Sequence, residues 1–112
     1  MIDQLRMMAI FQAVAEAGSF RAAAKRLNLS PSVVSHHISQ FEGQLGVPLL
    51  YRSTRRMSLT DAGRDLLEAS QRMSVAAEEG LAALERRKRN PAGRLLLTVN
   101  TDTANWPYSE IW

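Results

Sequence analysis

The chain has 112 residues, 46% of them hydrophobic, which suits one small domain with a tail and is too short for two full domains. It has no cysteine, which excludes a disulfide framework and thiolate zinc sites and fits a reducing compartment. The net charge is +3, and neither a membrane span nor a signal peptide is recognisable, so we expect a cytoplasmic protein without a membrane partner.

The positive charge is concentrated in the first half of the chain. Residues 1–60 carry seven Arg or Lys against three Asp or Glu, whereas residues 61–112 carry seven against eight. Most of the cations are Arg, whose planar fork matches phosphate groups and guanine edges. We therefore expect any phosphate-binding surface to lie within residues 1–60.

Two helices are predicted at the start of the chain. The first runs from Asp3 to Ala17, with Asp3 as its expected N-cap and Gly18 as its stop. Its buried stripe is expected to consist of Leu5, Met8, Phe11, Val14 and Ala15. The second, from Phe20 to Leu27, is short and follows Ser19, a residue type that caps helices well.

A third helix, from Ser30 to Leu45, follows a tight turn at Asn28 and Leu29, with Ser30 as N-cap and Pro31 at the first helical position. Its apolar stripe consists of Val34, Ile38, Phe41 and Leu45. The opposite face is small or hydrogen-bonding and has no fixed charge: Ser32, His36, Ser39, Gln40 and Gly43. Glu42 is the only carboxylate of this helix.

An uncharged polar face of this kind suits the major groove of DNA, where base edges offer donors and acceptors. Two helices joined by a short turn, the second carrying such a face, are typical of a helix-turn-helix. The alternative is a surface helix that happens to be rich in serine.

Two short strands are predicted next, over residues 47–51 and 57–59, with a polar turn from Arg52 to Arg56 between them. The turn contains three arginines. This pattern predicts a β-hairpin with a basic tip, the wing of a winged helix-turn-helix, which would contact the DNA backbone or minor groove. A solvated loop is the alternative, and the position directly after a helix-turn-helix favours the wing.

A long helix is predicted from Thr60, its cap, and Asp61 to about Lys88, because no proline interrupts this stretch. A seam at heptad-like spacing runs along it: Leu66, Met73, Ala77, Gly80 and Leu84. So small a domain cannot bury the whole helix, so we expect the seam to pair with a second copy in a homodimer. A single solvated helix is the alternative.

The last part of the chain is predicted to be a hinge at residues 90–93, one apolar strand at 94–99 and a tail without periodicity. One strand cannot form a domain. The predicted fold is therefore mainly α. Residues 1–60 form a winged helix-turn-helix of three helices and a two-stranded wing, 61–89 a linker and dimerisation helix, and 90–112 a poorly ordered hinge and the start of another domain.

Five motifs follow one another in a dense order: GSF-x-x-AA-x-x-L from Gly18, S-x-S-x-x-S-x-x-I from Ser30, LG-x-x-L from Leu45, R-x-x-R from Arg52 and LT-x-AG from Leu59. In these motifs the chain resembles the DNA-binding region of LysR-type transcriptional regulators, from about Leu5 to Val99. The resemblance implies a winged helix-turn-helix that dimerises through the linker helix, binds a partly palindromic operator in double-stranded DNA and needs no cofactor.

The resemblance also implies roles for single residues. Base-edge contacts would come from Pro31, Ser32, Ser35 and His36, the wing contact from Arg55 or Arg56, and phosphate contacts from Ser19, Ser39 and Arg52. Family core positions are matched by Phe11, Phe20, Leu27, Ile38 and Leu45. Position 36 is often Arg in the family, and a neutral His offers one hydrogen bond where Arg offers guanine two.

The resemblance stops at PAGRLLLTV, which is similar to the hinge and the first strand of the family's effector-binding domain. We therefore expect a chain that lacks most of the effector-binding domain, as a truncated protein, an excised piece or a shortened reading frame would, and that has no small-molecule site. The rival role is to pair with a full-length relative through the linker helix. Catalysis is not expected, because His36 and His37 point about 100° apart on a helix and have no third metal ligand nearby, and no glycine-rich phosphate loop is present.

Overall fold

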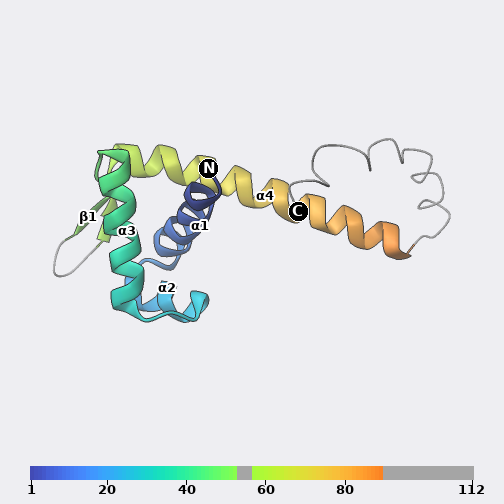
Figure 1. The fold of residues 1–112 in the computed structure, drawn as a ribbon, viewed down its shortest axis with the longest axis horizontal. Helices are drawn as coiled ribbons and strands as arrows, with labels where there is room; N and C mark the ends of the chain where they lie inside the picture. The colour runs from blue at the N-terminus through green and yellow to red at the C-terminus, as the bar shows by residue number, and fades with distance from the viewer. Residues whose placement is uncertain (53–56, 90–112) are drawn as a thin grey trace. The chain divides into compact units, whose positions relative to one another are not determined.

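The structure is a computed structural model, and it describes residues 1–52 and 57–89. In chain order the elements are α1 (Ile2–Ala17), α2 (Phe20–Leu27), α3 (Pro31–Leu45), β1 (Leu50–Arg52), β2 (Met57–Leu59) and α4 (Asp61–Arg89) (Figure 1). The predicted fold class, mainly α with a two-stranded sheet, is confirmed. The chain divides into two units, Met1–Val75 and Ala76–Trp112. The predicted hinge, the strand at 94–99 and the tail lie outside the described residues.

Local sequence signals account for most helix ends. The Ser19 hydroxyl accepts a backbone hydrogen bond at 3.0 Å at the start of α2, and the Ser30 hydroxyl accepts one at 3.2 Å at the start of α3. Gly18 and Gly46 close α1 and α3 with φ of 83° and 75°, a conformation that glycine adopts without steric cost. The helix ends predicted at Gly18, Ser19 and Ser30 are confirmed.

The start of α1 differs from the prediction. The helix begins at Ile2 with Met1 as its N-cap, so Asp3 is not the cap. Asp3 lies in the first turn, where its negative charge interacts favourably with the helix dipole. Leu5 is 41% exposed rather than buried. Phe11 and Val14 are buried as predicted, and Met8 and Ala15 are half-buried. Met7 and Ile10 complete the buried face at the helical spacing.

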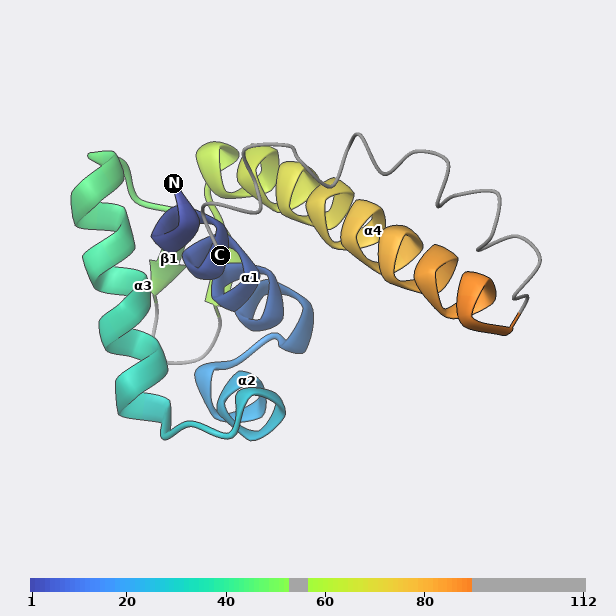
Figure 2. The same ribbon diagram turned by 45° about the vertical axis from the view of Figure 1, so that its right-hand side comes forward.

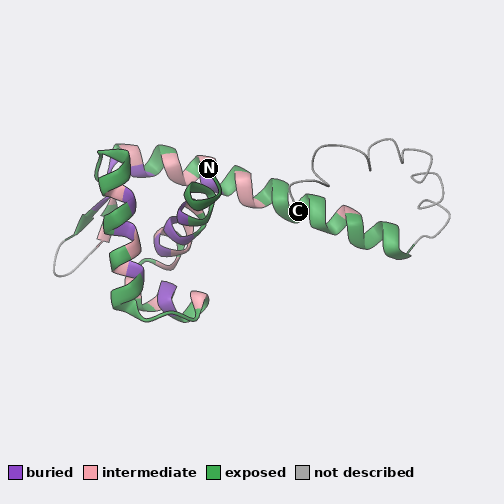
Figure 3. Cartoon of the chain, in the orientation of Figure 1, coloured by how far each residue is buried: buried purple, intermediate pink, exposed green. Residues whose placement is uncertain are grey.

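The core of the first unit lies where α1, α2 and α3 meet, and Figure 3 shows the buried residues on the sides that these helices turn toward one another. Ala23 and Ala24 of α2 are buried and keep that helix narrow. Phe20 and Leu27 are half-buried against the core, as expected. The expectation for Leu45 was wrong: it is exposed, because the end of α3 extends beyond the core and residues 43–48 are all exposed.

The hairpin is antiparallel, with Leu50 opposite Leu59 and Arg52 opposite Met57. Its first strand begins at Leu50, three residues later than predicted. The physical reason is that Pro48 has no N–H to donate to a strand partner, and that the N–H of Leu49 donates to a side chain of α3 instead. Residues 53–56, the predicted tip, lie outside the described residues.

The helix α4 starts close to the core of the first unit. The buried Thr60 caps it: its hydroxyl accepts from the Gly63 N–H at 3.0 Å and donates to the Pro48 carbonyl at 2.8 Å. Within the first unit, the Ser74 hydroxyl also donates to Gln12 of α1 at 2.5 Å. The 29-residue helix confirms the predicted long helix. Among the helices described, none combines the length and apolarity that crossing a membrane requires.

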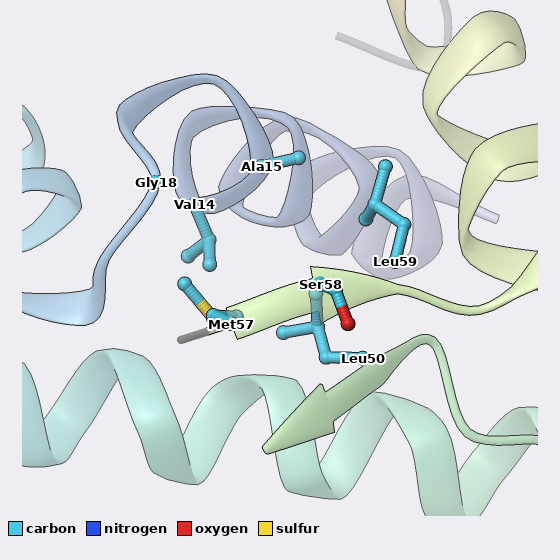
Figure 4. A pocket seen from close by; sticks show the side chains of 7 residues that line it. All are labelled: Val14, Ala15, Gly18, Leu50, Met57, Ser58 and Leu59. Atoms are coloured by element: carbon cyan, nitrogen blue, oxygen red, sulfur yellow. The ribbon is translucent and has the colours of Figure 1, made fainter. Parts of the chain in front are cut away.

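One small pocket lies between the C-terminal end of α1 and the hairpin (Figure 4). Its apolar lining includes Val14, Leu50, Met57 and Leu59. The volume of about 30 Å³ has room for one or two water molecules, since a cavity needs about 10–15 Å³ to hold one. This pocket is therefore too small to hold a metabolite.

Candidate nucleic-acid interface

The polar face of α3 lies at the surface of the first unit. Ser32, His36, Ser39, Gln40 and Gly43 are exposed, and the buried residues of the helix are Val34, Ile38 and Phe41. The predicted separation of the two faces is thus confirmed. Among the predicted base-contacting residues, Pro31, Ser32 and His36 are exposed and Ser35 is half-buried.

The first turn of α3 is held by serine hydroxyl groups. The Ser30 oxygen accepts from the Val33 N–H and lies 3.2 Å from the Ser32 oxygen, at a distance where either hydroxyl can donate. This contact places the Ser32 side chain at the positive end of the helix dipole, which favours negatively charged or hydrogen-bond-accepting partners.

Ser19 has a similar place at the start of α2. Its oxygen accepts the N–H of Ala22, and the side chain is exposed. A hydroxyl group that accepts a hydrogen bond still has its own hydrogen to donate. The cap is therefore compatible with the phosphate contact expected of Ser19.

Two of the predicted phosphate-contacting residues are in direct contact with each other. Arg52, in β1, donates from Nη1 to the Ser39 hydroxyl of α3 at 3.0 Å. Its Nη2 donates to Glu42 Oε1 at 3.0 Å, and the guanidinium carbon lies 5.4 Å from the centre of the Phe20 ring in α2. The Arg52 side chain thus joins three elements of the first unit.

Glu42 is a residue whose role the sequence analysis missed. Its second oxygen, Oε2, accepts from the backbone N–H groups of Leu49 and Leu50 at 2.7 and 3.2 Å. The side chain therefore ties α3 to the start of β1 as well as to Arg52. The signal in the sequence is that Glu42 is the only carboxylate of α3, but its partners lie seven to ten residues away along the chain.

The two wing arginines, Arg55 and Arg56, lie outside the described residues. His36 and His37 have ring centroids 6.3 Å apart. Within residues 1–52 and 57–89, no three His, Asp or Glu side chains are grouped in a way that could hold a metal ion.

The predicted seam of α4 has two kinds of surroundings. Leu66 and Met73 belong to the first unit, where both are half-buried and Leu66 packs against the core. Ala77, Gly80 and Leu84 belong to the second unit and are exposed. Leu66 thus contributes to packing within its own chain, and the exposed part of the seam lies in the second half of the helix.

The chain is similar to a known protein family and to known regulators. The family described as "Bacterial regulatory helix-turn-helix protein, lysR family" matches residues 5–64. The HTH-type transcriptional regulator PtxR of Pseudomonas aeruginosa is 42% identical over 101 residues, which are 90% of this chain and 32% of PtxR. XapR of Escherichia coli K12, also an HTH-type transcriptional regulator, is 44% identical over 102 residues, or 91% of this chain and 34% of XapR.

Solved structures of two related regulators have a similar fold. The DNA-binding domain of CbnR in complex with DNA is 40% identical with a TM-score of 0.63, over 79% of this chain and 97% of that one. The DNA-binding domain of BenM with benA site 1 DNA is 27% identical with a TM-score of 0.69, over 77% and 97%. The chain spans about a third of the length of the curated relatives it matches. The family match covers the whole helix-turn-helix and the wing, and the chain belongs to the LysR family of bacterial helix-turn-helix regulatory proteins.

Proposed function

We propose that the chain binds specific sequences of double-stranded DNA as part of a bacterial transcriptional regulator in the cytoplasm. The helix α3 lies in the major groove, with Pro31, Ser32, Ser35 and His36 at the base edges. Arg55 or Arg56 of the wing reaches the backbone or minor groove. The observation that carries this proposal is the exposed, uncharged polar face of α3, opposite its buried stripe.

The chemistry of this face suits the reading of bases. Serine hydroxyl groups donate and accept, and His36 offers one hydrogen bond in its neutral form. Val33, in the first turn of α3, is also exposed, and its methyl groups can contact the methyl group of thymine. A face without Lys or Arg leaves base recognition to hydrogen bonds and shape, while cations of neighbouring elements contact phosphates.

The direct test is DNA binding by the 112-residue protein. We expect it to enrich one duplex sequence from a random pool, with an affinity that falls linearly on logarithmic axes as salt increases, by about 0.9 per phosphate contact. Fluorescence anisotropy would measure this slope, with a scrambled duplex of equal composition as the control. A folded protein that enriched no sequence and bound no duplex in a salt-dependent way would contradict the proposal.

We also propose that the chain forms a homodimer through α4. The exposed Ala77 and Gly80 carry little or no side chain, so the two helix backbones can approach closely, with Leu84 packing beside them. A dimer would place two α3 helices on the two halves of a partly palindromic operator, about one helical turn of DNA apart.

Leu84→Glu is expected to turn the dimer into a monomer, because two carboxylates would be buried against each other in the seam. Multi-angle light scattering would report the mass. Val75→Glu is the matched control: Val75 is 51% exposed and Leu84 53% exposed, and the two lie about 180° apart on the helix at about 100° per residue. If Leu84→Glu still has the mass of a dimer, the dimer does not form through this seam of α4, and if the wild-type chain has the mass of a monomer, the homodimer itself is disproved.

The rival role, pairing with a full-length relative, would use the same exposed residues of α4. The observation in its favour is that Leu81 and Leu84 remain exposed on the second half of that helix. Co-expression with a full-length LysR-family regulator would distinguish the two roles: a mixed dimer that forms at the expense of the homodimer supports pairing.

A further inference from the structure

We propose that Glu42 is a positioning residue for DNA binding, which holds Arg52 against Ser39 so that these two side chains form one preassembled contact for a DNA phosphate. We call the two side chains the Ser39–Arg52 pair. The proposal rests on the DNA-binding function proposed above and names a contact within that same interface.

The Ser39–Arg52 pair joins α3 to the wing hairpin. Ser39 and Arg52 are 13 residues apart in sequence, and their side chains are in hydrogen-bond contact at 3.0 Å. Ser39 belongs to the exposed polar face of α3, and Arg52 ends the first strand of the hairpin. A phosphate bound here would therefore lie beside the groove that α3 occupies, where a backbone contact fixes the register of the helix on the duplex.

Both side chains keep the chemistry that a phosphate needs. The Ser39 oxygen accepts from Arg52, and its own hydrogen is available to donate. A guanidinium has five N–H groups in a fixed fork, of which these contacts with Ser39 and Glu42 use two. The Arg52 side chain is 38% exposed, whereas that of Glu42 is only 16% exposed. The cation of the ion pair is thus more accessible to DNA than the anion.

Glu42 is placed to set the direction of Arg52. One of its oxygens is held by two backbone N–H groups at the start of β1, and the other receives Arg52. The Phe20 ring also lies within cation–π distance of the guanidinium. A side chain held by contacts from α2 and α3 loses little further freedom when it binds phosphate, which favours binding by preorganisation.

Plain electrostatics makes the opposite prediction for Glu42. A carboxylate beside DNA repels phosphates, so removing its charge should strengthen binding to every duplex, whatever the sequence. If Glu42 positions Arg52, removing the charge should weaken binding to the preferred duplex, because the phosphate contact that fixes the register is lost. The two effects therefore differ in sign.

The test uses the duplex that the wild-type chain selects from a random pool and a scrambled duplex of the same composition. For Glu42→Gln we expect a loss of about tenfold in affinity for the selected duplex and a smaller loss for the scrambled one. Asp3→Asn is the matched control: it makes the same charge change at an exposed site in the first turn of α1, and we expect an unchanged ratio of the two affinities. Selected-duplex binding by Glu42→Gln that equals or exceeds that of wild type overturns the proposal.

A double-mutant cycle shows whether Glu42 acts through Arg52. Arg52→Met is expected to weaken binding by about as much as Glu42→Gln and to lower the salt slope by about one. The double variant should bind no more weakly than Arg52→Met alone. If Glu42→Gln weakens binding by the same factor in the Arg52→Met background, Glu42 does not act through Arg52 and the proposal fails.

Circular dichroism and thermal melting establish that each variant is folded. If Glu42→Gln does not fold, the cycle of Ser39→Ala and Arg52→Met takes its place: a double variant no weaker than Arg52→Met supports one shared contact, and additive losses overturn it. If the wild-type chain binds no duplex, the proposed function itself is wrong. If the wild-type chain binds and Glu42→Gln binds the selected duplex as tightly as wild type or more tightly, only the positioning role fails.

Discussion

Ser32→Asp is expected to stabilise the folded protein and yet to weaken its binding to the selected duplex on the order of a hundredfold. Ser32 is the second residue of α3 and is exposed. A carboxylate in the first turn of a helix interacts favourably with the helix dipole, by about 0.3–1 kcal/mol. In the major groove the same carboxylate would face phosphates and base acceptors, and like charges brought together cost several kcal/mol.

Urea unfolding would measure the stability and fluorescence anisotropy the affinity. The matched control is Gln4→Asp, which adds the same charge at an exposed position in the first turn of α1. Figures 1 and 2 show that α1 starts near the end of α3 rather than near its start. We therefore expect Gln4→Asp to leave the affinity almost unchanged. If Ser32→Asp bound the selected duplex like wild type, the first turn of α3 would not face DNA.

Gly63→Ala is expected to destabilise the protein by about 3 kcal/mol, the upper part of the range for overpacked cores. A Cβ at position 63 would lie 2.1 Å from the carbonyl oxygen of Leu49 and 3.4 Å from a methyl carbon of Leu59. The Leu49 carbonyl cannot easily move away, because it accepts the backbone N–H of Thr60 at 3.0 Å. The start of α4 would have to separate from the hairpin.

A glycine-to-alanine substitution in α3 should have the opposite effect on the stability of the protein. Gly43 is helical and exposed, and a Cβ there would meet nothing within 4 Å. Gly43→Ala should therefore stabilise the protein by about 0.5–1 kcal/mol, the difference in helix propensity between the two residues. Urea unfolding of both variants gives the comparison. A Gly63→Ala protein as stable as wild type would show that the close approach to Leu49 is not required.

The features that were predicted correctly are those that depend on neighbours along the chain. The caps at Ser19, Ser30 and Thr60 involve N–H groups three residues away. The buried stripe of α3 from Val34 to Phe41 follows from helical periodicity alone. The exposed polar face, and with it most of the candidate base-contacting residues, follows for the same reason.

The incorrect predictions concern the ends of helices and strands. Periodicity shows which side of a helix is apolar, but not which of its turns are covered by the other helices. Leu5 and Leu45 fit an apolar stripe, but each lies near an end of its helix, beyond the part that the other helices cover. The start of β1 was placed too early because Val47 to Tyr51 is a run favourable to strands. Its first residues are instead used to connect the helix α3 to the hairpin through Glu42.

By itself, the sequence determined the helices, most of their caps, the presence of two wing strands and the uncharged face of α3, because each depends on interactions within a few residues of the chain. Only the tertiary structure decided what Glu42, Arg52 and Gly63 do. Glu42 and Arg52 meet because α3 packs beside the hairpin, and Gly63 must lack a side chain because α4 starts against Leu49. Such contacts depend on the separation of elements in space, which a local pattern of residues does not specify.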